Sequence, residues 1–336
     1  MALAGHSRPA MTTESGAEKV VYLLKPRGFC AGVVRAIDIV ELALRVYGPP
    51  IYVRREIVHN RFVVQDLAGR GAIFVDELDE VPAGERVIYS AHGVAPSVRA
   101  QAAERGLKVI DATCPLVTKV HLEAVRYAAE DASILLIGHR DHEEVIGTMG
   151  EAPTRTTVVS TREEARLVTV ANPEKGYYLT QTTLSLDEAG EIISVLKQRF
   201  PNIQGPPGQD ICYATENRQR AVKRVAPRCD VLLVVGSENS SNSRRLVEVG
   251  VNAGTAGYLV DNEGEIDAAW LRQATTVAIT AGASAPELLV QRVLDRLARM
   301  GFTRVEEVEM VDEDVKFPLP PELAPHAPLL TTISPR

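Results

Sequence analysis

Short runs of apolar, often β-branched residues alternate with segments of helical periodicity along most of the chain. The runs predict β-strands at 20–24, 51–55, 72–75, 86–90, 108–110, 133–137, 156–159, 177–180, 230–235, 258–260 and 276–280. Strands that alternate with helices are typical of parallel sheets joined by crossover helices. The chain is therefore predicted to be an α/β protein that binds its ligands beyond the carboxyl ends of the strands.

The spacing of apolar residues also locates helices. Val33, Ile37, Val40 and Leu44 fall on one helical face, and Gly48-Pro49-Pro50 ends that helix. A second helix is predicted at 214–226, where Pro227 stops it.

Near the carboxyl end, Leu289, Val293 and Leu297 form another apolar face. The preceding Ser284-Ala285-Pro286-Glu287 has the form of a capping box, which predicts Ser284 as the N-cap of this helix. The segment after Phe317 is rich in proline and is predicted to be irregular or disordered.

Composition and charge exclude several classes of protein. The 336 residues are 45% hydrophobic and 24% charged, which is ordinary for a globular protein of two or three domains. The net charge of −7 argues against sequence-independent binding to nucleic acids. The longest apolar runs, such as 231–235, are far too short to cross a membrane. With no signal-peptide core in 1–18 and four widely spaced cysteines, we expect a cytoplasmic protein.

Three of the four cysteines share a local context. Cys30, Cys114 and Cys212 each follow a short strand or turn, and each opens a predicted helix. This spacing predicts three similar α/β units, each with one cysteine at a helix N-terminus. The corresponding segments are a flexible tail at 1–18, α/β domains at 19–113, 114–209 and 210–302, and a partly irregular C-terminal extension at 303–336.

A helix N-terminus carries partial positive charge, which lowers the pKa of a thiol and favours the metal-binding thiolate. Cys30, Cys114 and Cys212 are therefore candidate metal ligands, although each could instead be a small buried hydrophobic residue. The chain has no C-x-x-C pair, which disfavours zinc ribbons and ferredoxin-type carriers. A mononuclear metal and an iron–sulfur cluster both remain open. Cys229, at the start of an apolar strand, is interpreted as structural.

Polar residues at the strand ends form a second candidate group. Imidazole, hydroxyl and amide side chains occur at 58–60, 90–93, 138–144, 180–183, 237–243 and 281–284. Such donors near helix N-termini suit a phosphate or carboxylate. The segment 239–243 could equally be an Asx-rich turn, and His139, His142 and Glu144 could belong to a surface loop or a zinc site. Because nucleotide-binding G-x-G-x-x-G and P-loop sequences are absent, a metal-centred site with an anion pocket is favoured.

A series of motifs extends this pattern from Lys25 to Phe317. They are PRGFCAGV (26–33), VHNRFVV (58–64), SAHGV (90–94), DATCPLVTKVH (111–121), GTMGE (147–151), TQTTLS (180–185), ICYATENRQ (211–219), GSENSSNS (236–243) and TAGASAP (280–286). In sequence and order they closely resemble the 4-hydroxy-3-methylbut-2-enyl diphosphate reductase family, the last enzymes of the non-mevalonate isoprenoid pathway.

The resemblance implies three similar parallel-sheet α/β domains in a pseudo-threefold arrangement around a central iron–sulfur cluster. Cys30, Cys114 and Cys212 match the ligands of a 4Fe-4S cluster, whose fourth iron stays open for the substrate hydroxyl. Glu144 matches the family's proton donor, while His142 and Thr182 position it and the substrate hydroxyl, with Thr183 as a weaker neighbour. The residues implied to bind the diphosphate are His59, His92, Ser240, Ser241, Asn242 and Ser284.

The implied reaction is a reductive dehydroxylation of (E)-4-hydroxy-3-methylbut-2-enyl diphosphate to isopentenyl and dimethylallyl diphosphates. Two electrons enter through the cluster, the C–O bond breaks as the leaving hydroxide is protonated, and the allylic species is then protonated. An external donor such as flavodoxin or ferredoxin is implied, although no motif identifies it. Two alternatives are a cluster dehydratase, in which iron acts only as a Lewis acid, and an iron–sulfur redox sensor with a decayed active site. The intact Glu144, Thr182 and 239–243 loop argue against the sensor.

Overall fold

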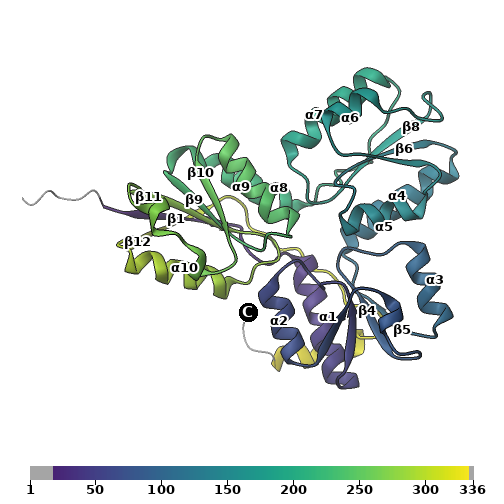
Figure 1. The fold of residues 1–336 in the computed structure, drawn as a ribbon, viewed down its shortest axis with the longest axis horizontal. Coiled ribbons are helices and arrows are strands. Elements are labelled where there is room, and N and C mark those ends of the chain that lie inside the picture. Colours follow the sequence, from purple (N-terminus) through teal and green to yellow (C-terminus); the bar gives the residue numbers. More distant parts are fainter. Residues whose placement is uncertain (1–17, 333–336) are drawn as a thin grey trace, which may run out of the picture.

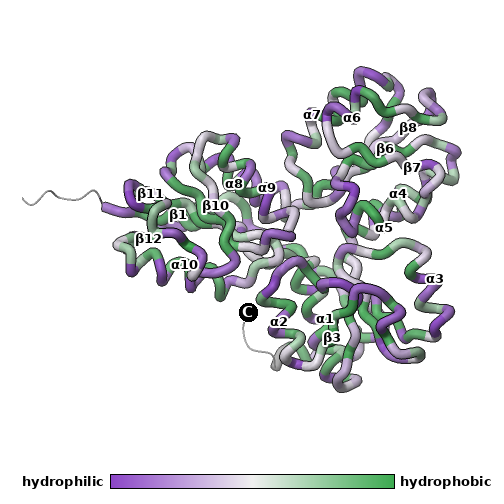
Figure 2. Tube along the Cα trace, viewed as in Figure 1, coloured by the Kyte–Doolittle hydropathy of each residue, from purple (hydrophilic) through white to green (hydrophobic). Residues whose placement is uncertain are grey.

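The computed structural model describes residues 18–332, so the predicted flexible tail at 1–18 lies almost wholly outside the described residues. Three lobes surround a common centre (Figure 1), and each lobe contains one parallel sheet. Figure 2 shows hydrophobic segments along the strands inside each lobe. None of the helices within 18–332 is long and apolar enough to span a bilayer.

The first lobe contains a four-stranded sheet in the order β3-β2-β4-β5. Its strands are β2 (Ile51–Arg54), β3 (Ala72–Val75), β4 (Arg86–Tyr89) and β5 (Lys108–Asp111). Its helices are α1 (Ala31–Tyr47), α2 (Arg61–Gly69) and α3 (Pro96–Glu104), with a 3₁₀ turn at Leu78–Glu80.

The second lobe contains a three-stranded sheet in the order β7-β6-β8. Its strands are β6 (Ser133–Ile137), β7 (Thr156–Val159) and β8 (Gly176–Thr180). Its helices are α4 (Pro115–Ala129), α5 (Glu143–Glu151), α6 (Arg162–Leu167) and α7 (Leu186–Arg199).

The third lobe contains a five-stranded sheet in the order β10-β9-β11-β1-β12. Its strands are β1 (Val20–Lys25), β9 (Val231–Val235), β10 (Ala256–Val260), β11 (Thr276–Ala281) and β12 (Arg304–Glu309). Its helices are α8 (Tyr213–Val225), α9 (Ser241–Asn252) and α10 (Glu287–Arg299), with 3₁₀ turns at Ala226–Arg228, Glu263–Glu265 and Ala268–Leu271.

At both ends of the chain, the third sheet includes a strand that the sequence does not predict for it. We expected the strand at 20–24 in the segment 19–113, but β1 lies between β11 and β12 in the third sheet. We expected 304–309 within the partly irregular extension, yet it forms the edge strand β12. Its sequence, RVEEVE, is mostly charged, which suits a sheet edge and hides the strand from a search for apolar runs.

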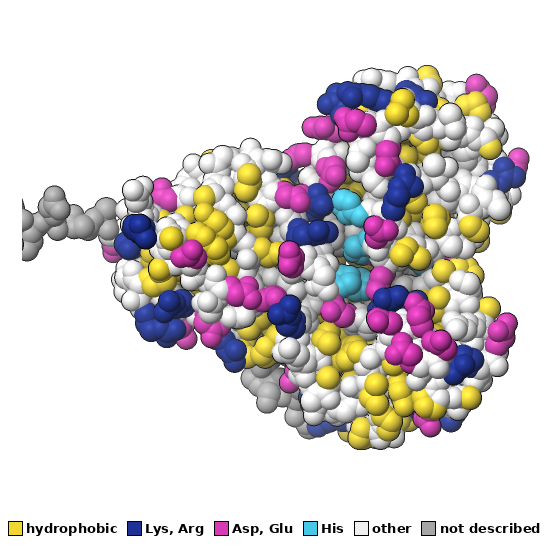
Figure 3. Space-filling view, in the orientation of Figure 1, with side chains coloured by type: hydrophobic (Ala, Val, Ile, Leu, Met, Phe, Trp, Pro, Cys, Tyr) yellow, Lys and Arg dark blue, Asp and Glu magenta, His cyan; other side chains and the backbone are white. Residues whose placement is uncertain are grey.

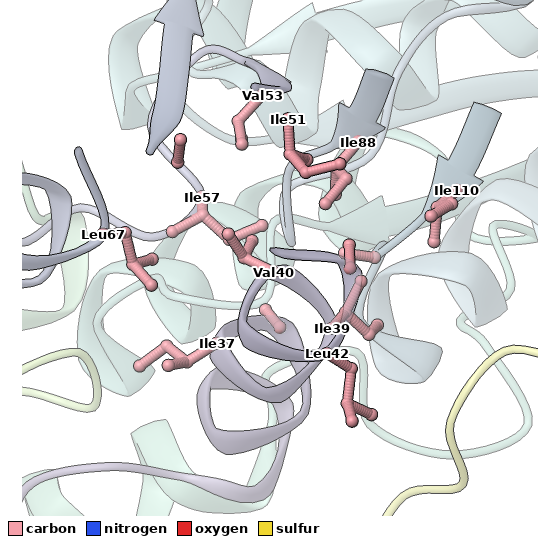
Figure 4. Close-up of a cluster of buried hydrophobic side chains, with 14 of the residues drawn as sticks. Ile37, Ile39, Val40, Leu42, Ile51, Val53, Ile57, Leu67, Ile88 and Ile110 are labelled. Atoms are coloured by element: carbon pink, nitrogen blue, oxygen red, sulfur yellow. The ribbon is translucent and has the colours of Figure 1, made fainter. Parts of the chain in front are cut away.

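The apolar face predicted for α1 forms the core of the first lobe. Ile37 and Val40 are buried in a cluster with Ile51 of β2 and Ile88 of β4 (Figure 4). This packing fixes α1 against its sheet, and with it the position of Cys30 at the start of the helix.

The C-terminal segment packs on the first lobe, which corrects the prediction of a disordered end for its described part. Leu323 is fully buried in the same core as α1, and Arg35 Nε donates a hydrogen bond to the Pro318 carbonyl at 2.7 Å. A 3₁₀ helix follows at Ala324–Thr332. Much of the segment lacks regular structure, yet buried apolar contacts hold it in place.

Candidate active site

One pocket lies where the three lobes meet and is lined by residues of all three. Histidine side chains gather at this junction on the face shown in Figure 3. The pocket lining includes every site residue expected from the sequence: Cys30, His59, His92, Cys114, His142, Glu144, Thr182, Thr183, Cys212, Ser240, Ser241, Asn242 and Ser284. The fold thus brings together residues that are more than 250 positions apart in the chain.

The three cysteines occupy equivalent places in the fold. Cys30, Cys114 and Cys212 are the N-cap residues of α1, α4 and α8, as the sequence predicts. A Cβ atom added to Gly32 would lie 2.7 Å from Cys114 Sγ and 3.8 Å from Cys30 Sγ. The absence of a side chain at residue 32 therefore keeps open the space between two of the thiols.

The thiol pKa values differ from the sequence-based expectation. Burial, with a contribution from Cys30, raises the pKa of Cys114 to about 12 and that of Cys212 to about 11. Desolvation of the thiolate outweighs the positive end of the helix, which the sequence argument considered alone. Buried thiols of this kind become thiolates when a metal centre supplies compensating positive charge.

All three thiols face one pocket, although no single-ion site is formed in the part of the chain that the structure describes. Among residues 18–332, no group of three or more His, Cys, Asp or Glu side chains is close enough to hold a single metal ion. Cys30, Cys114 and Cys212 therefore remain the candidate ligands, with Gly32 beside two of them.

Three histidines cluster on one side of the pocket. The rings of His59 and His92 stack with centroids 4.0 Å apart, and His142 approaches both edge-on. Burial lowers the pKa of His142 to about 2, and its Nδ1 accepts the backbone N–H of Glu144 at 3.2 Å. His142 is therefore neutral and presents a protonated Nε2.

Glu144 lies in the first turn of α5 and is 6% exposed. The Thr182 backbone N–H donates to one carboxyl oxygen at 2.9 Å, and Thr182 Oγ1 lies 2.9 Å from both. Burial raises the pKa of Glu144 although these hydrogen bonds oppose the shift. The result is a fixed carboxyl group that retains its proton to higher pH than an exposed glutamate, as a general acid requires.

The third lobe contributes a cluster of small polar side chains. Ser240 is the N-cap of α9, and its hydroxyl accepts the Ser243 N–H at 3.3 Å. Asn242 Oδ1 accepts the Ala283 N–H at 2.9 Å, which joins the two strand-end loops of this lobe. Hydroxyl and amide groups thus line the pocket at the N-terminus of a helix, a place that suits an anion.

Ser284 has a different role from the predicted N-cap. The N-cap of α10 is Pro286, and Ser284 Oγ donates a 2.9 Å hydrogen bond to the His59 carbonyl in the first lobe. The Ser-x-x-Glu pattern was misleading because the helix begins only at Glu287. Ser284 instead connects two lobes at the pocket.

Several residues at the site were not singled out from the sequence. Thr215 donates its backbone N–H to Cys212 Sγ at 3.4 Å, and Phe317 of the C-terminal segment lines the pocket. Glu56 and Glu143 contact His59 and His92. Both glutamates flank expected site residues in the sequence, but only the fold shows which histidine each one contacts.

Other candidates lie away from the pocket. His121 Nδ1 is 2.8 Å from Glu151, which fits a structural role, and His139 is not part of the lining. Cys229 does not line the pocket either, and its Sγ donates to the Val225 carbonyl at 3.4 Å.

Comparison with known proteins decides the family. The family model described as "LytB protein" matches residues 21–298. The chain belongs to the LytB protein family. The expected resemblance and the α/β fold with several parallel sheets are both confirmed.

Members of the LytB family with high similarity share one name. The 4-hydroxy-3-methylbut-2-enyl diphosphate reductase of Mycolicibacterium gilvum is 57% identical, over 93% of this chain and 94% of its own length. The protein of that name from Acidothermus cellulolyticus is 58% identical, over 90% of this chain and 89% of its own.

Two solved structures of similar proteins agree with this assignment. The E-1-hydroxy-2-methyl-but-2-enyl-4-diphosphate reductase from Plasmodium falciparum is 40% identical, with a TM-score of 0.89, and the match covers 94% of this chain and 99% of that one. A structure of (E)-4-hydroxy-3-methyl-but-2-enyl diphosphate reductase is 31% identical with a TM-score of 0.60, and the match covers 84% and 99%.

Proposed function

We propose that this chain catalyses the reductive dehydroxylation of (E)-4-hydroxy-3-methylbut-2-enyl diphosphate to isopentenyl and dimethylallyl diphosphates, the final step of the non-mevalonate isoprenoid pathway. One observation carries the proposal: three thiols, a buried carboxyl group and a hydroxyl-rich helix N-terminus line the same pocket. These are the groups needed to hold a redox centre, protonate a leaving hydroxide and bind a diphosphate. The names of the relatives support the same reaction.

Cys30, Cys114 and Cys212 would hold one 4Fe-4S cluster, with its fourth iron free of protein ligands. The space kept open by Gly32 and the three separate helix starts fit a polynuclear group. When bound, such a cluster supplies electrons and a Lewis-acidic iron next to the substrate hydroxyl. An external protein such as flavodoxin or ferredoxin would deliver the electrons, and the cytoplasm would be the compartment.

The diphosphate would lie against the start of α9. Ser240, Ser241 and Asn242 present hydroxyl and amide groups there, and the helix N-terminus adds partial positive charge. Ser284, His59 and His92 complete this side of the pocket. Of the described residues that line it, none is Lys or Arg, so neutral donors and imidazoles must compensate the charge of the substrate.

Glu144 would donate the proton that converts the leaving hydroxide to water. Its raised pKa keeps the proton available, and the two contacts from Thr182 fix the direction of the carboxyl group. Hydroxide is a poor leaving group, so general acid catalysis at this point is worth about 10² to 10⁴-fold in rate. The Nε2–H of neutral His142 is available to orient the substrate hydroxyl.

The proposal is tested by anaerobic turnover of the allylic diphosphate with a strong artificial reductant, on protein whose iron content has been measured. We expect isopentenyl and dimethylallyl diphosphates to form only when reductant is present, with two electrons consumed for each product molecule. Loss of water without consumption of electrons would instead show a cluster dehydratase. Absence of any reaction in iron-loaded protein would contradict the proposal.

A further inference from the structure

Two histidines of the pocket each contact a carboxylate through the same ring nitrogen. His59 Nδ1 lies 3.1 Å from Glu56 Oε2, and His92 Nδ1 lies 3.3 Å from Glu143 Oε2. Because an ionised carboxylate only accepts hydrogen bonds, both Nδ1 atoms must carry the proton. The Nε2 edges of the stacked rings then remain for a ligand.

Other groups hold these two carboxylates in place. Asn239 Nδ2 donates to Glu56 Oε2 at 2.7 Å, which connects the first lobe to the loop that begins α9. Ser90 Oγ donates to Glu143 Oε2 at 3.4 Å, and Arg55 Nε lies 4.0 Å from Glu143 Oε1. Each glutamate is therefore an oriented partner of its histidine.

We propose that Glu56 and Glu143 are positioning residues for the diphosphate. They fix the stacked rings of His59 and His92, with both Nε2 atoms available to phosphate oxygens. They also supply the negative charge that favours the imidazolium form of these rings. This inference rests on the proposed function, since it concerns the same pocket. It would explain how a pocket whose described lining includes no Lys or Arg can bind a strongly anionic group.

The charged groups around the two rings determine whether the pKa of each histidine is raised or lowered. Burial opposes a charge on His92, but the contact and charge of Glu143, with the charge of Glu56, raise its pKa above the ordinary value. Burial and the neighbouring His92 lower the pKa of His59, against the opposing effect of Glu56 and Glu143. The edge-on His142 is neutral and adds no charge. His92 is therefore the more readily protonated of the two rings, and the charge of an arriving diphosphate favours protonation of both.

The test uses the iron-loaded holoprotein and inorganic diphosphate as the probe. Calorimetric titrations in buffers of different ionisation enthalpy, from about pH 6 to about pH 9, measure the affinity and the protons taken up on binding. In Glu143→Gln we expect the affinity at neutral pH to fall about tenfold, because the charge that favours protonation of His92 is removed. The number of protons taken up on binding should rise, because Glu143 no longer favours protonation of His92 before the diphosphate binds.

Steady-state kinetics provides a second measurement on the same variants. Glu143→Gln and Glu56→Gln should raise KM for the allylic diphosphate about tenfold and change kcat by less than about threefold, because they affect binding and not the proton donor. Glu143→Asp, which restores the charge, should recover part of the affinity. Glu191→Gln is the matched control: Glu191 is exposed and does not line the pocket, so the change should leave binding and turnover unaltered.

Unchanged affinity and unchanged proton uptake in both glutamine variants would overturn the inference, as would a loss confined to kcat. If Glu143→Gln fails to retain iron, Glu56→Gln provides the same test from the other side of the stacked pair. The binding titration is independent of turnover. A wild-type protein that binds diphosphate but makes no product would contradict the proposed reaction, while the positioning role would still be decided by the variants.

Discussion

Individual side chains carry most of the chemistry of this pocket, and the sequence motifs identify many of them. All the site residues expected from the motifs line one cavity. The sequence could not show their electrostatic state, because that depends on burial and on contacts between lobes. Cys114 illustrates this: a helix start predicts a lowered thiol pKa, whereas burial raises it to about 12. Glu143 was missed for the same reason, since its contact with His92 joins two lobes.

Replacement of Glu144 tests the role of the buried acid. Glu144→Gln keeps the size of the side chain and can still accept the hydrogen bonds from Thr182, but it cannot donate a carboxyl proton. We expect kcat to fall by about 10² to 10⁴-fold, with iron content and substrate affinity little changed. Steady-state kinetics and an iron assay measure the three quantities. Turnover equal to that of the unmodified protein would remove Glu144 from this role.

The pH dependence of the unmodified protein gives an independent test of the same group. Glu144 must be protonated to act, and burial raises its pKa. The value of kcat should therefore be highest at low pH and fall as pH rises through that raised pKa. Measurements with a pH-insensitive reductant separate this effect from electron delivery. A kcat that rises with pH over this range is the opposite sign and would be incompatible with an acid role.

At the scale of elements, the starts of helices organise the site. The sequence correctly predicts that Cys30, Cys114 and Cys212 begin α1, α4 and α8, because each is followed by a clear helical pattern. The prediction for Ser284 was wrong, because a capping-box pattern specifies a local sequence and not the residue at which the helix begins. Local patterns therefore located the thiols but not the contact from Ser284 to the first lobe.

Cysteine variants distinguish the helix starts from the remaining thiol. Cys30→Ser should reduce the iron bound per chain to a small fraction of the unmodified value, because one of the three proposed ligands is lost. Cys229→Ser should leave it unchanged, since the Cys229 thiol donates to the Val225 carbonyl and does not line the pocket. Iron analysis and absorbance of anaerobically reconstituted protein make the comparison. Equal loss of iron in both variants would contradict the assignment of the ligands.

The whole molecule depends on contacts that connect the ends of the chain to its middle. The strands at 51–281 could be predicted from apolar runs, and three parallel sheets follow from them. The membership of β1 in the third sheet could not, because nothing within 20–25 distinguishes a partner in the first lobe from β11. The C-terminal segment was likewise misjudged, since Leu323 and Phe317 find their contacts only once the lobes are formed.

An anaerobic crystal structure of the iron-loaded protein with the allylic diphosphate tests most directly whether the cluster and the substrate share this pocket. We expect one iron–sulfur cluster on Cys30, Cys114 and Cys212, with the diphosphate at the start of α9. The substrate hydroxyl should then lie between the cluster and Glu144. A cluster on other ligands, or a diphosphate bound outside the junction of the three lobes, would contradict the proposed site.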